Sequence, residues 1–153
     1  NDIAYGKVFF KKSGYITREW APYFIAVRRG NASFEEEYSS GTISNYAKRI
    51  YSVVVEHGTL PLHGIKDLIG FEKEDKAQFD RALVELQMKM YLTMCGRQQK
   101  VSQKGEEYGW SSTVFCTTES FWGADVFASL ITAQVFSINP EAAPKKVLKF
   151  IMG

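Results

Sequence analysis

Two cysteines and two histidines are all that this chain of 153 residues offers for metal binding by sulfur or imidazole. Cys95 and Cys116 form no C-x-x-C pair, so a zinc site of conventional spacing is excluded. The sequence also lacks a glycine-rich phosphate loop of the P-loop type and a nucleophile elbow. We therefore expect no metal and no other cofactor.

Long apolar runs and a strong charge of one sign are missing as well. No run reaches membrane-spanning length and no signal-peptide pattern is present, which predicts a cytoplasmic protein with no membrane partner. The net charge is only +2, so any binding of nucleic acid must depend on local basic patches. Hydrophobic residues make up 45% of the chain, which is enough to bury a core.

Residues 41–122 follow the order of one winged helix-turn-helix. The pattern predicts a helix over 42–57, a short strand over 59–62, helices over 63–69 and 72–90, a strand over 91–95, a loop (the wing) over 96–110 and a returning strand over 114–118. Most small modules with this order bind nucleic acid. The predicted fold class is therefore α+β, a winged helix-turn-helix with additions at both ends.

The two ends of the chain are expected to pack around this unit. Residues 1–40 are interpreted as an N-terminal hairpin and helix, followed by a linker or mobile loop over 31–42. Residues 123–153 are expected to form C-terminal helices, the last of them over 141–151.

Apolar spacing predicts which face of the third helix of the winged unit is buried. Three of its residues share one stripe, and the opposite face is charged. The stripe consists of Phe79, Leu83 and Leu86, and its expected partners are Ile50, Val54 and Leu68.

The third helix is also the first candidate for contact with DNA. In a winged helix it enters the major groove, where Arg and Gln side chains read base edges. Lys73, Gln78 and Arg81 have suitable chemistry, but Glu74 and Glu85 share the exposed face. Because carboxylates repel phosphates, the balance of charge favours the alternative, a solvated helix face.

The wing offers a second basic group. Arg97, Lys100 and Lys104 lie on a glycine-bearing loop that could follow a phosphate backbone. Glu106 and Glu107 come next, so a basic loop tip without a ligand is an equal alternative. Cys95 and Cys116 flank the loop on its two strands, where buried free thiols are favoured over a redox switch.

The N-terminal region is the most basic part of the sequence. Its candidate residues are Lys11, Lys12 and Arg18, and Tyr15 and Trp20 are interleaved with them. Such a mixture can hold a phosphate backbone and stack on a base. The alternative, which we slightly favour, is a hairpin that packs its aromatic side chains inward.

Three stretches of the sequence resemble the bacterial AlkZ/YcaQ proteins: VEHGTLPLHGIKDLIG, RALVELQMKMYLTMCGRQQK and YGWSSTVFCTTESFW. YITREWAPYFIAVRR and NPEAAPKKVLKFI are similar to the shorter, AlkZ-related branch. The resemblance implies ancestry among winged-helix DNA glycosylases, which unhook interstrand crosslinks and remove alkylated bases. It also implies double-stranded DNA, damaged or intact, as the partner.

The resemblance carries over no catalytic residue. Family members with base excision share a glutamine-x-glutamine or glutamine-x-aspartate motif in an earlier winged helix, and only one complete winged unit is recognisable here. The leading hypothesis is a DNA-binding protein related to repair glycosylases, with excision left to a longer chain. The alternatives are a regulator that binds an operator as a homodimer and a winged helix that contacts another protein.

Overall fold

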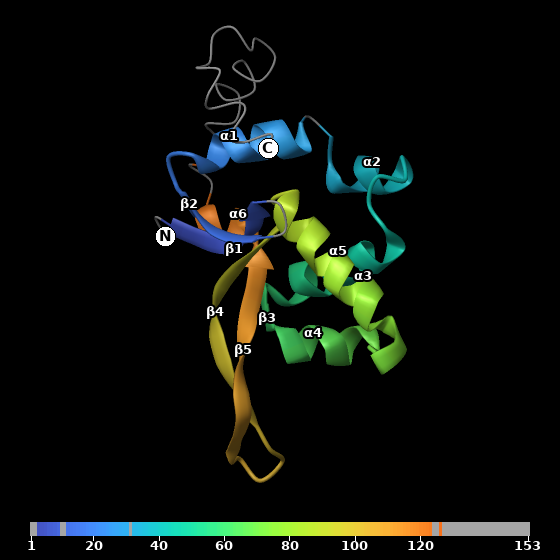
Figure 1. The fold of residues 1–153 in the computed structure, drawn as a ribbon, viewed down its shortest axis with the longest axis vertical. Helices are drawn as coiled ribbons and strands as arrows, with labels where there is room; N and C mark the ends of the chain where they lie inside the picture. The colour runs from blue at the N-terminus through green and yellow to red at the C-terminus, as the bar shows by residue number, and fades with distance from the viewer. Residues whose placement is uncertain (1–2, 10–11, 31, 124–125, 127–153) are drawn as a thin grey trace, which may run out of the picture.

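A computed structural model describes residues 3–9, 12–30, 32–123 and 126. It shows an α+β fold with one five-stranded antiparallel sheet in the order β2-β1-β4-β5-β3 (Figure 1). The strands are β1 (Ile3–Phe9), β2 (Lys12–Thr17), β3 (Thr59–Pro61), β4 (Leu92–Val101) and β5 (Glu107–Thr117). The helices are α1 (Ala21–Arg29), α2 (Phe34–Ser39), α3 (Asn45–His57), α4 (Leu62–Ile69), α5 (Lys76–Met88) and α6 (Thr118–Trp122), with a 3-10 turn η1 (Lys73–Asp75) before α5.

The three helices expected between residues 41 and 122 are present as α3, α4 and α5. The hydroxyl of Ser44 accepts a hydrogen bond from the Ala47 amide at 3.1 Å and caps α3. Gly70 ends α4 in the left-handed conformation, with φ of +67°, which favours glycine. The third helix starts later than expected, because residues 73–75 form the 3-10 turn.

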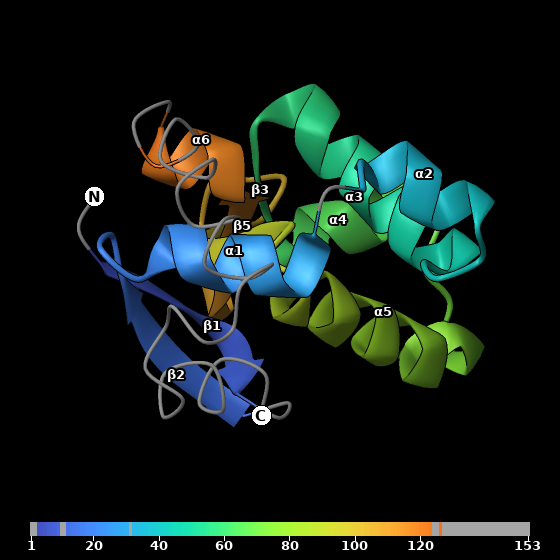
Figure 2. The ribbon, with the colours of Figure 1, turned by 90° about the horizontal axis from the view of Figure 1, so that it is seen from above.

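Two hydrophobic cores hold the fold together. Figure 2 shows helices α2 to α5 grouped on one side of the molecule and β1, β2 and α6 on the other. The larger core lies between α2, α3, α4, α5 and the strands β3 to β5, and it contains the predicted stripe of Phe79, Leu83 and Leu86 together with Ile50 and Val54. Leu68 was predicted to join this core, but its side chain is 49% exposed. Ile65 and Ile69 of α4 are buried instead, because residues four apart lie on one face of a helix.

The prediction of a linker or mobile loop over residues 31–42 is wrong for the middle of this segment. Residues 34–39 form helix α2, which begins with a capping box between Ser33 and Glu36. Phe34 is buried and stacks on Tyr51 of α3, with ring centroids 4.1 Å apart. Burial of this aromatic ring fixes a segment whose other residues are mostly polar.

The N-terminal hairpin of β1 and β2 joins the rest of the molecule through β4 and α5. Tyr5 pairs with Met94, and the hydroxyl of Thr93 donates a hydrogen bond to the Tyr5 carbonyl at 3.3 Å. The Lys7 amide donates to the side-chain carbonyl of Gln87 at 2.9 Å, and the amide group of Gln87 donates to the Leu83 carbonyl at 3.0 Å. Gln87 is buried, so both bonds are shielded from water.

Of the region after β5, whose residues 123–153 were expected to form helices, the structure describes residues 118–123 and 126. Helix α6 follows β5 directly and buries Trp122 in the smaller core with α1, β1 and β2. The helix expected over 141–151 lies outside the described residues. Among the described helices, none combines the length and the apolar character that crossing a membrane requires.

Candidate nucleic-acid interface

The most prominent surface feature is the long hairpin of β4 and β5, which extends away from the helices (Figure 1). The sequence predicted a loop over 96–110, but the two strands pair as far as Val101 and Glu107. Only residues 102–106 turn between the strands, with Gly105 at φ of +80°. The expected basic loop is therefore mostly a two-stranded arm, which places side chains at fixed positions.

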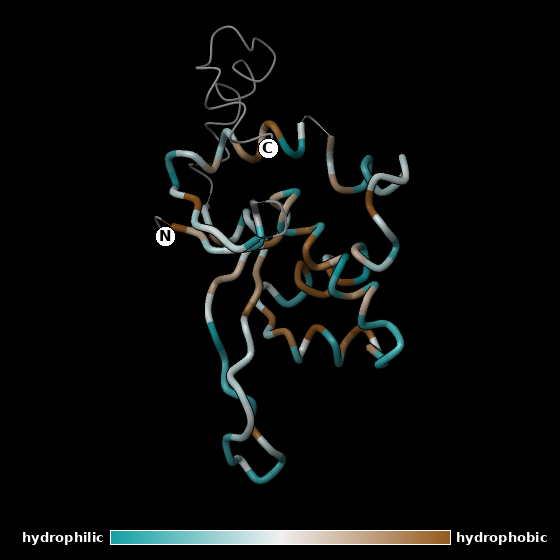
Figure 3. The backbone as a smooth tube through the Cα atoms, in the orientation of Figure 1, coloured by the Kyte–Doolittle hydropathy of each residue, from teal (hydrophilic) through white to brown (hydrophobic). Residues whose placement is uncertain are grey.

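Basic side chains follow the outer half of this hairpin. Arg97, Gln98 and Lys104 are exposed and Lys100 is half-buried. Figure 3 shows the outer half of β4 and the turn as largely hydrophilic. Glu106 and Glu107 are also exposed here, so the local field is only weakly positive.

Arg97 is held against the hairpin by two hydrogen bonds. Its Nε donates to the hydroxyl of Ser111 at 2.8 Å, and its Nη2 donates to the Ser111 carbonyl at 2.9 Å. These bonds fix the guanidinium along the arm and leave it exposed to solvent. Lys100 and Lys104 have no such anchors among the hydrogen bonds of the described residues, and their flexible stems suit phosphate contacts.

The same hairpin carries an exposed aromatic residue, Trp110, that was not among the predicted site residues. Trp110 of β5 is 90% exposed, and Tyr108 is 55% exposed. A tryptophan in a strand is more often buried against a core, and sequence alone does not reveal which face of a hairpin has a core behind it. Gly109 next to it was the one available signal of an irregular strand.

The exposed face of α5 borders a groove of about 490 Å³ between this helix and the start of α3. Gln78 and Arg81, two of the predicted site residues, line it. Lys73, the third, is exposed on the 3-10 turn before α5. The groove also contains Asp75 and Glu85, so it is polar without a marked excess of positive charge.

Arg49 of α3 is a second arginine at this groove, and the sequence analysis did not select it. Its Nη2 donates to the carbonyl of Ile69 at the end of α4, and its guanidinium lies 5.1 Å from the ring centroid of Tyr46. Burial raises the pKa of Tyr46, and the neighbouring Asp75 carboxylate raises it further. The phenol is therefore neutral and can act as a hydrogen-bond donor in the groove.

Lys12 and Arg18, the N-terminal candidates that the structure describes, lie apart from the β4–β5 hairpin. Lys11 lies outside the described residues, and Lys12 is exposed at the start of β2. Arg18 follows β2 and is half-buried. Figure 1 places β1 and β2 at the other end of the molecule from the hairpin turn. The predicted residues that the structure describes thus form three separate groups: one at the N-terminal hairpin, one on η1 and α5, and one on the β4–β5 hairpin.

The aromatic side chains of the N-terminal hairpin differ from the favoured expectation. Tyr15 is 71% exposed and contacts Tyr5 across the strands, with ring centroids 4.9 Å apart. Inward packing is therefore wrong for Tyr15, whereas Ile16 supplies the buried side chain of β2. Alternation along a strand explains the difference, because successive side chains point to opposite faces.

The two cysteines meet at the base of the hairpin as free thiols. Cys116 is buried and Cys95 is half-buried. A hydrogen bond with Cys95, together with burial, raises the pKa of Cys116, and the same bond lowers the pKa of Cys95. Cys95 lies at a register shift, where Met94 pairs with Phe115 and Gly96 pairs with Val114.

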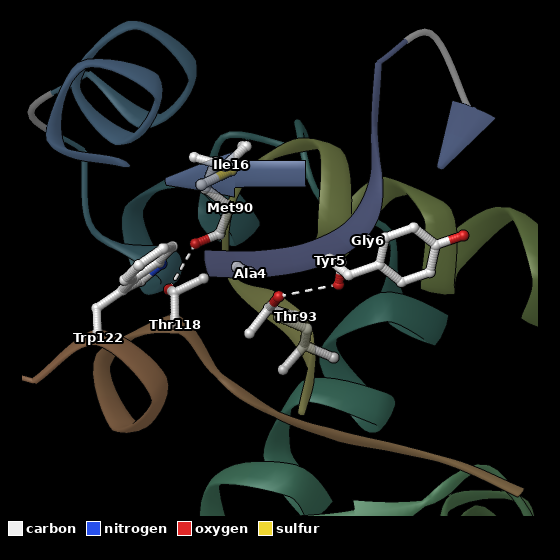
Figure 4. A pocket seen from close by; sticks show the side chains of 9 residues that line it. Ala4, Tyr5, Gly6, Ile16, Met90, Thr93, Thr118 and Trp122 are labelled. Carbon is white, nitrogen blue, oxygen red and sulfur yellow. Dashed lines mark hydrogen bonds between the residues drawn. The ribbon is translucent and has the colours of Figure 1, made fainter. Parts of the chain in front are cut away.

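A small cavity lies beside the smaller core, between β1, β2, β4 and α6 (Figure 4). Trp122, Met90 and Thr118 contribute to its lining, and the hydroxyl of Thr118 donates to the Met90 carbonyl at 2.6 Å. Its volume of about 10 Å³ is close to the minimum for one water molecule. It is therefore far too small for a nucleobase.

Comparison with known protein families identifies a relationship for this chain. The profile of the AlkZ-related family matches residues 1–152, almost the whole chain. No curated protein and no solved structure matches the sequence. Among the described residues, no three His, Cys, Asp or Glu side chains lie together in a way that could hold a metal ion.

Proposed function

The chain belongs to the AlkZ-related family, and on this premise we propose that it binds double-stranded DNA through a winged helix-turn-helix built from α3 to β5. The order α3-β3-α4-α5-β4-β5 and the pairing of β5 with both β3 and β4 support this proposal. The observation that carries it is the long paired β4–β5 hairpin, which carries cationic side chains well away from the helices.

The two DNA-contacting parts have different tasks in this proposal. Helix α5 approaches the major groove with Gln78 and Arg81, whose side chains suit base edges. The hairpin contacts the phosphate backbone through Arg97, Lys100 and Lys104. Because Asp75 and Glu85 offset the positive charge beside α5, most of the affinity comes from the hairpin and depends little on base sequence.

A salt titration with plain, mismatched and alkylated duplexes tests the proposal. Lys100→Ala combined with Lys104→Ala removes two phosphate contacts, so the slope of log affinity against log salt falls by about 2. Glu106→Gln combined with Glu107→Gln, on the same hairpin, is the matched control of opposite sign and is expected to strengthen binding. If the lysine pair leaves both affinity and slope unchanged, the hairpin does not contact DNA.

A further inference from the structure

We infer that Trp110 is a stacking platform for an unpaired nucleobase, so that the preferred ligand is DNA in which one base has left the duplex stack. This inference rests on the proposed DNA binding and adds the class of DNA to it. The indole is 90% exposed, the largest exposed fraction among the large hydrophobic side chains of the described residues. Holding so much apolar surface in water is unfavourable unless a ligand covers it.

The backbone around Trp110 is built to present the ring. Gln98 pairs with Ser112 and Lys100 pairs with Tyr108, so three residues of β5 lie opposite Gln99 alone. Gly109 within this bulge has φ of +66°, a conformation that favours glycine. Bulges of this kind bend a strand and redirect its side chains.

Side chains of the opposite strand hold the bulge in place. The amide group of Gln99 donates to the carbonyls of Tyr108 at 3.1 Å and Gly109 at 2.9 Å. Arg97 binds both the hydroxyl and the carbonyl of Ser111, on the other side of Trp110. The residues before and after the tryptophan are therefore fixed, and the ring is held out from an ordered backbone.

The cations of the hairpin favour a nucleobase over a protein side chain as the occupant. Arg97 is bonded to Ser111, the residue after Trp110, and Lys100 pairs with Tyr108, whereas lysine is depleted in the cores of protein interfaces. An exposed aromatic ring on a hairpin that also carries cations is the arrangement that binds single-stranded nucleic acid, because every base has a flat face. Tyr108, two residues before Trp110 and also exposed, provides a second ring for an adjacent base.

Fluorescence anisotropy of the whole chain with three labelled DNAs tests this inference. The probes are a fully paired duplex, the same duplex with one unpaired adenine, and an oligo-dT single strand. We expect the chain to favour the DNAs with unpaired bases, and Trp110→Ala to weaken binding to them by about tenfold more than binding to the paired duplex. Trp110→Phe keeps a ring and retains most of the preference.

Val101→Ser is the matched control, because Val101 is an exposed apolar side chain of the same hairpin without a ring. It is expected to leave all three affinities unchanged. If the chain binds the duplex but Trp110→Ala weakens all three DNAs equally or not at all, the inference is overturned while the proposed function stands. Absence of any DNA binding overturns both. Loss of self-association in Trp110→Ala, measured by sedimentation with DNA binding intact, assigns the ring to a contact between copies.

Discussion

The hydroxyl of Tyr91 donates a hydrogen bond to the carboxylate of Glu37, 54 residues earlier in the chain. Glu37 of α2 also accepts a hydrogen bond from Lys89 at 2.9 Å, and Arg29 of α1 lies 4.2 Å from the ring centroid of Tyr91. Arg29 in turn forms an ion pair with Glu119 of α6 at 2.7 Å. This network joins the end of α5 to three helices that precede and follow the proposed winged helix.

Tyr91→Phe is expected to destabilise the protein because it removes a hydrogen bond to a charged, largely buried acceptor. Tyr91 is 2% exposed, and the loss is about 1.5–3 kcal/mol in the free energy of unfolding. Tyr108→Phe, at an exposed position, is the control and should change stability by no more than about 0.5 kcal/mol. Urea denaturation at neutral pH measures both. Equal stability of the two variants would mean that the Tyr91–Glu37 bond contributes nothing.

The stability that Tyr91 contributes is expected to decrease at alkaline pH. Burial raises the pKa of Tyr91, and the neighbouring Glu37 carboxylate raises it further. The folded state therefore holds the phenol proton more tightly than the unfolded chain does, so this stabilisation is full below pH about 10 and is lost as the pH rises above it. Urea denaturation at pH about 8 and at pH about 11 measures how much the free energy of unfolding falls between the two. This fall should be smaller for Tyr91→Phe than for the natural chain, because the variant has no phenol proton to lose.

The buried stripe of α5 gives a prediction with an internal control. Leu83→Ala removes a side chain packed in the larger core and should cost about 2–5 kcal/mol in the free energy of unfolding. Arg81→Ala, on the exposed side of the same helix, should change it by no more than about 0.5 kcal/mol. Thermal or urea denaturation compares them. If Arg81→Ala is the more destabilising, the helix is rotated, and Gln78 and Arg81 do not face DNA.

Periodicity was sufficient to place the long helices and their apolar faces, because a stripe such as Phe79, Leu83 and Leu86 fits only one side of a helix. It was insufficient for elements held by distant contacts. Helix α2 has only six residues, and its polar sequence is fixed by Phe34 packing on Tyr51 and by Glu37 bonding to Tyr91. Such partners, far along the chain, leave no local pattern.

The same limit applied to the candidate site. The cationic residues of the β4–β5 hairpin could be selected by charge alone, but the strand pairing that extends the arm depends on register. The exposure of Trp110 follows from a bulge whose carbonyls are bonded by Gln99. Neither the bulge nor the exposure of the ring has a signature in the sequence beyond Gly109.

Helix α4 offers a direct test of one expectation that the structure corrects. Ile65 is fully buried and Leu68 is 49% exposed, although both are large aliphatic residues of an eight-residue helix. Ile65→Ala should lower the free energy of unfolding by about 2–5 kcal/mol, whereas Leu68→Ala should change it by no more than about 0.5 kcal/mol. Parallel urea titrations decide the matter. A larger effect of Leu68→Ala would restore the packing that periodicity alone had suggested.

The chain contains one glutamine-x-aspartate triplet, Gln78-Phe79-Asp80, which has the spacing of the motif that base-excising relatives are expected to carry. The triplet lies inside α5, however, and residues two apart on a helix do not face each other. Gln78 lines the groove beside α3, whereas Asp80 forms an ion pair with Lys76 at 2.6 Å.

The two side chains therefore cannot hold one water molecule against a flipped nucleotide, which excision of a base requires. We expect the purified chain to release no bases from an alkylated duplex, even at high protein concentration. Abasic sites are scored by strand cleavage in alkali against a control without protein. Cleavage above that control, abolished by Gln78→Ala, would contradict the expectation and identify the groove between α3 and α5 as an active site. Cleavage that survives Gln78→Ala would also contradict it, and would place the chemistry elsewhere in the chain.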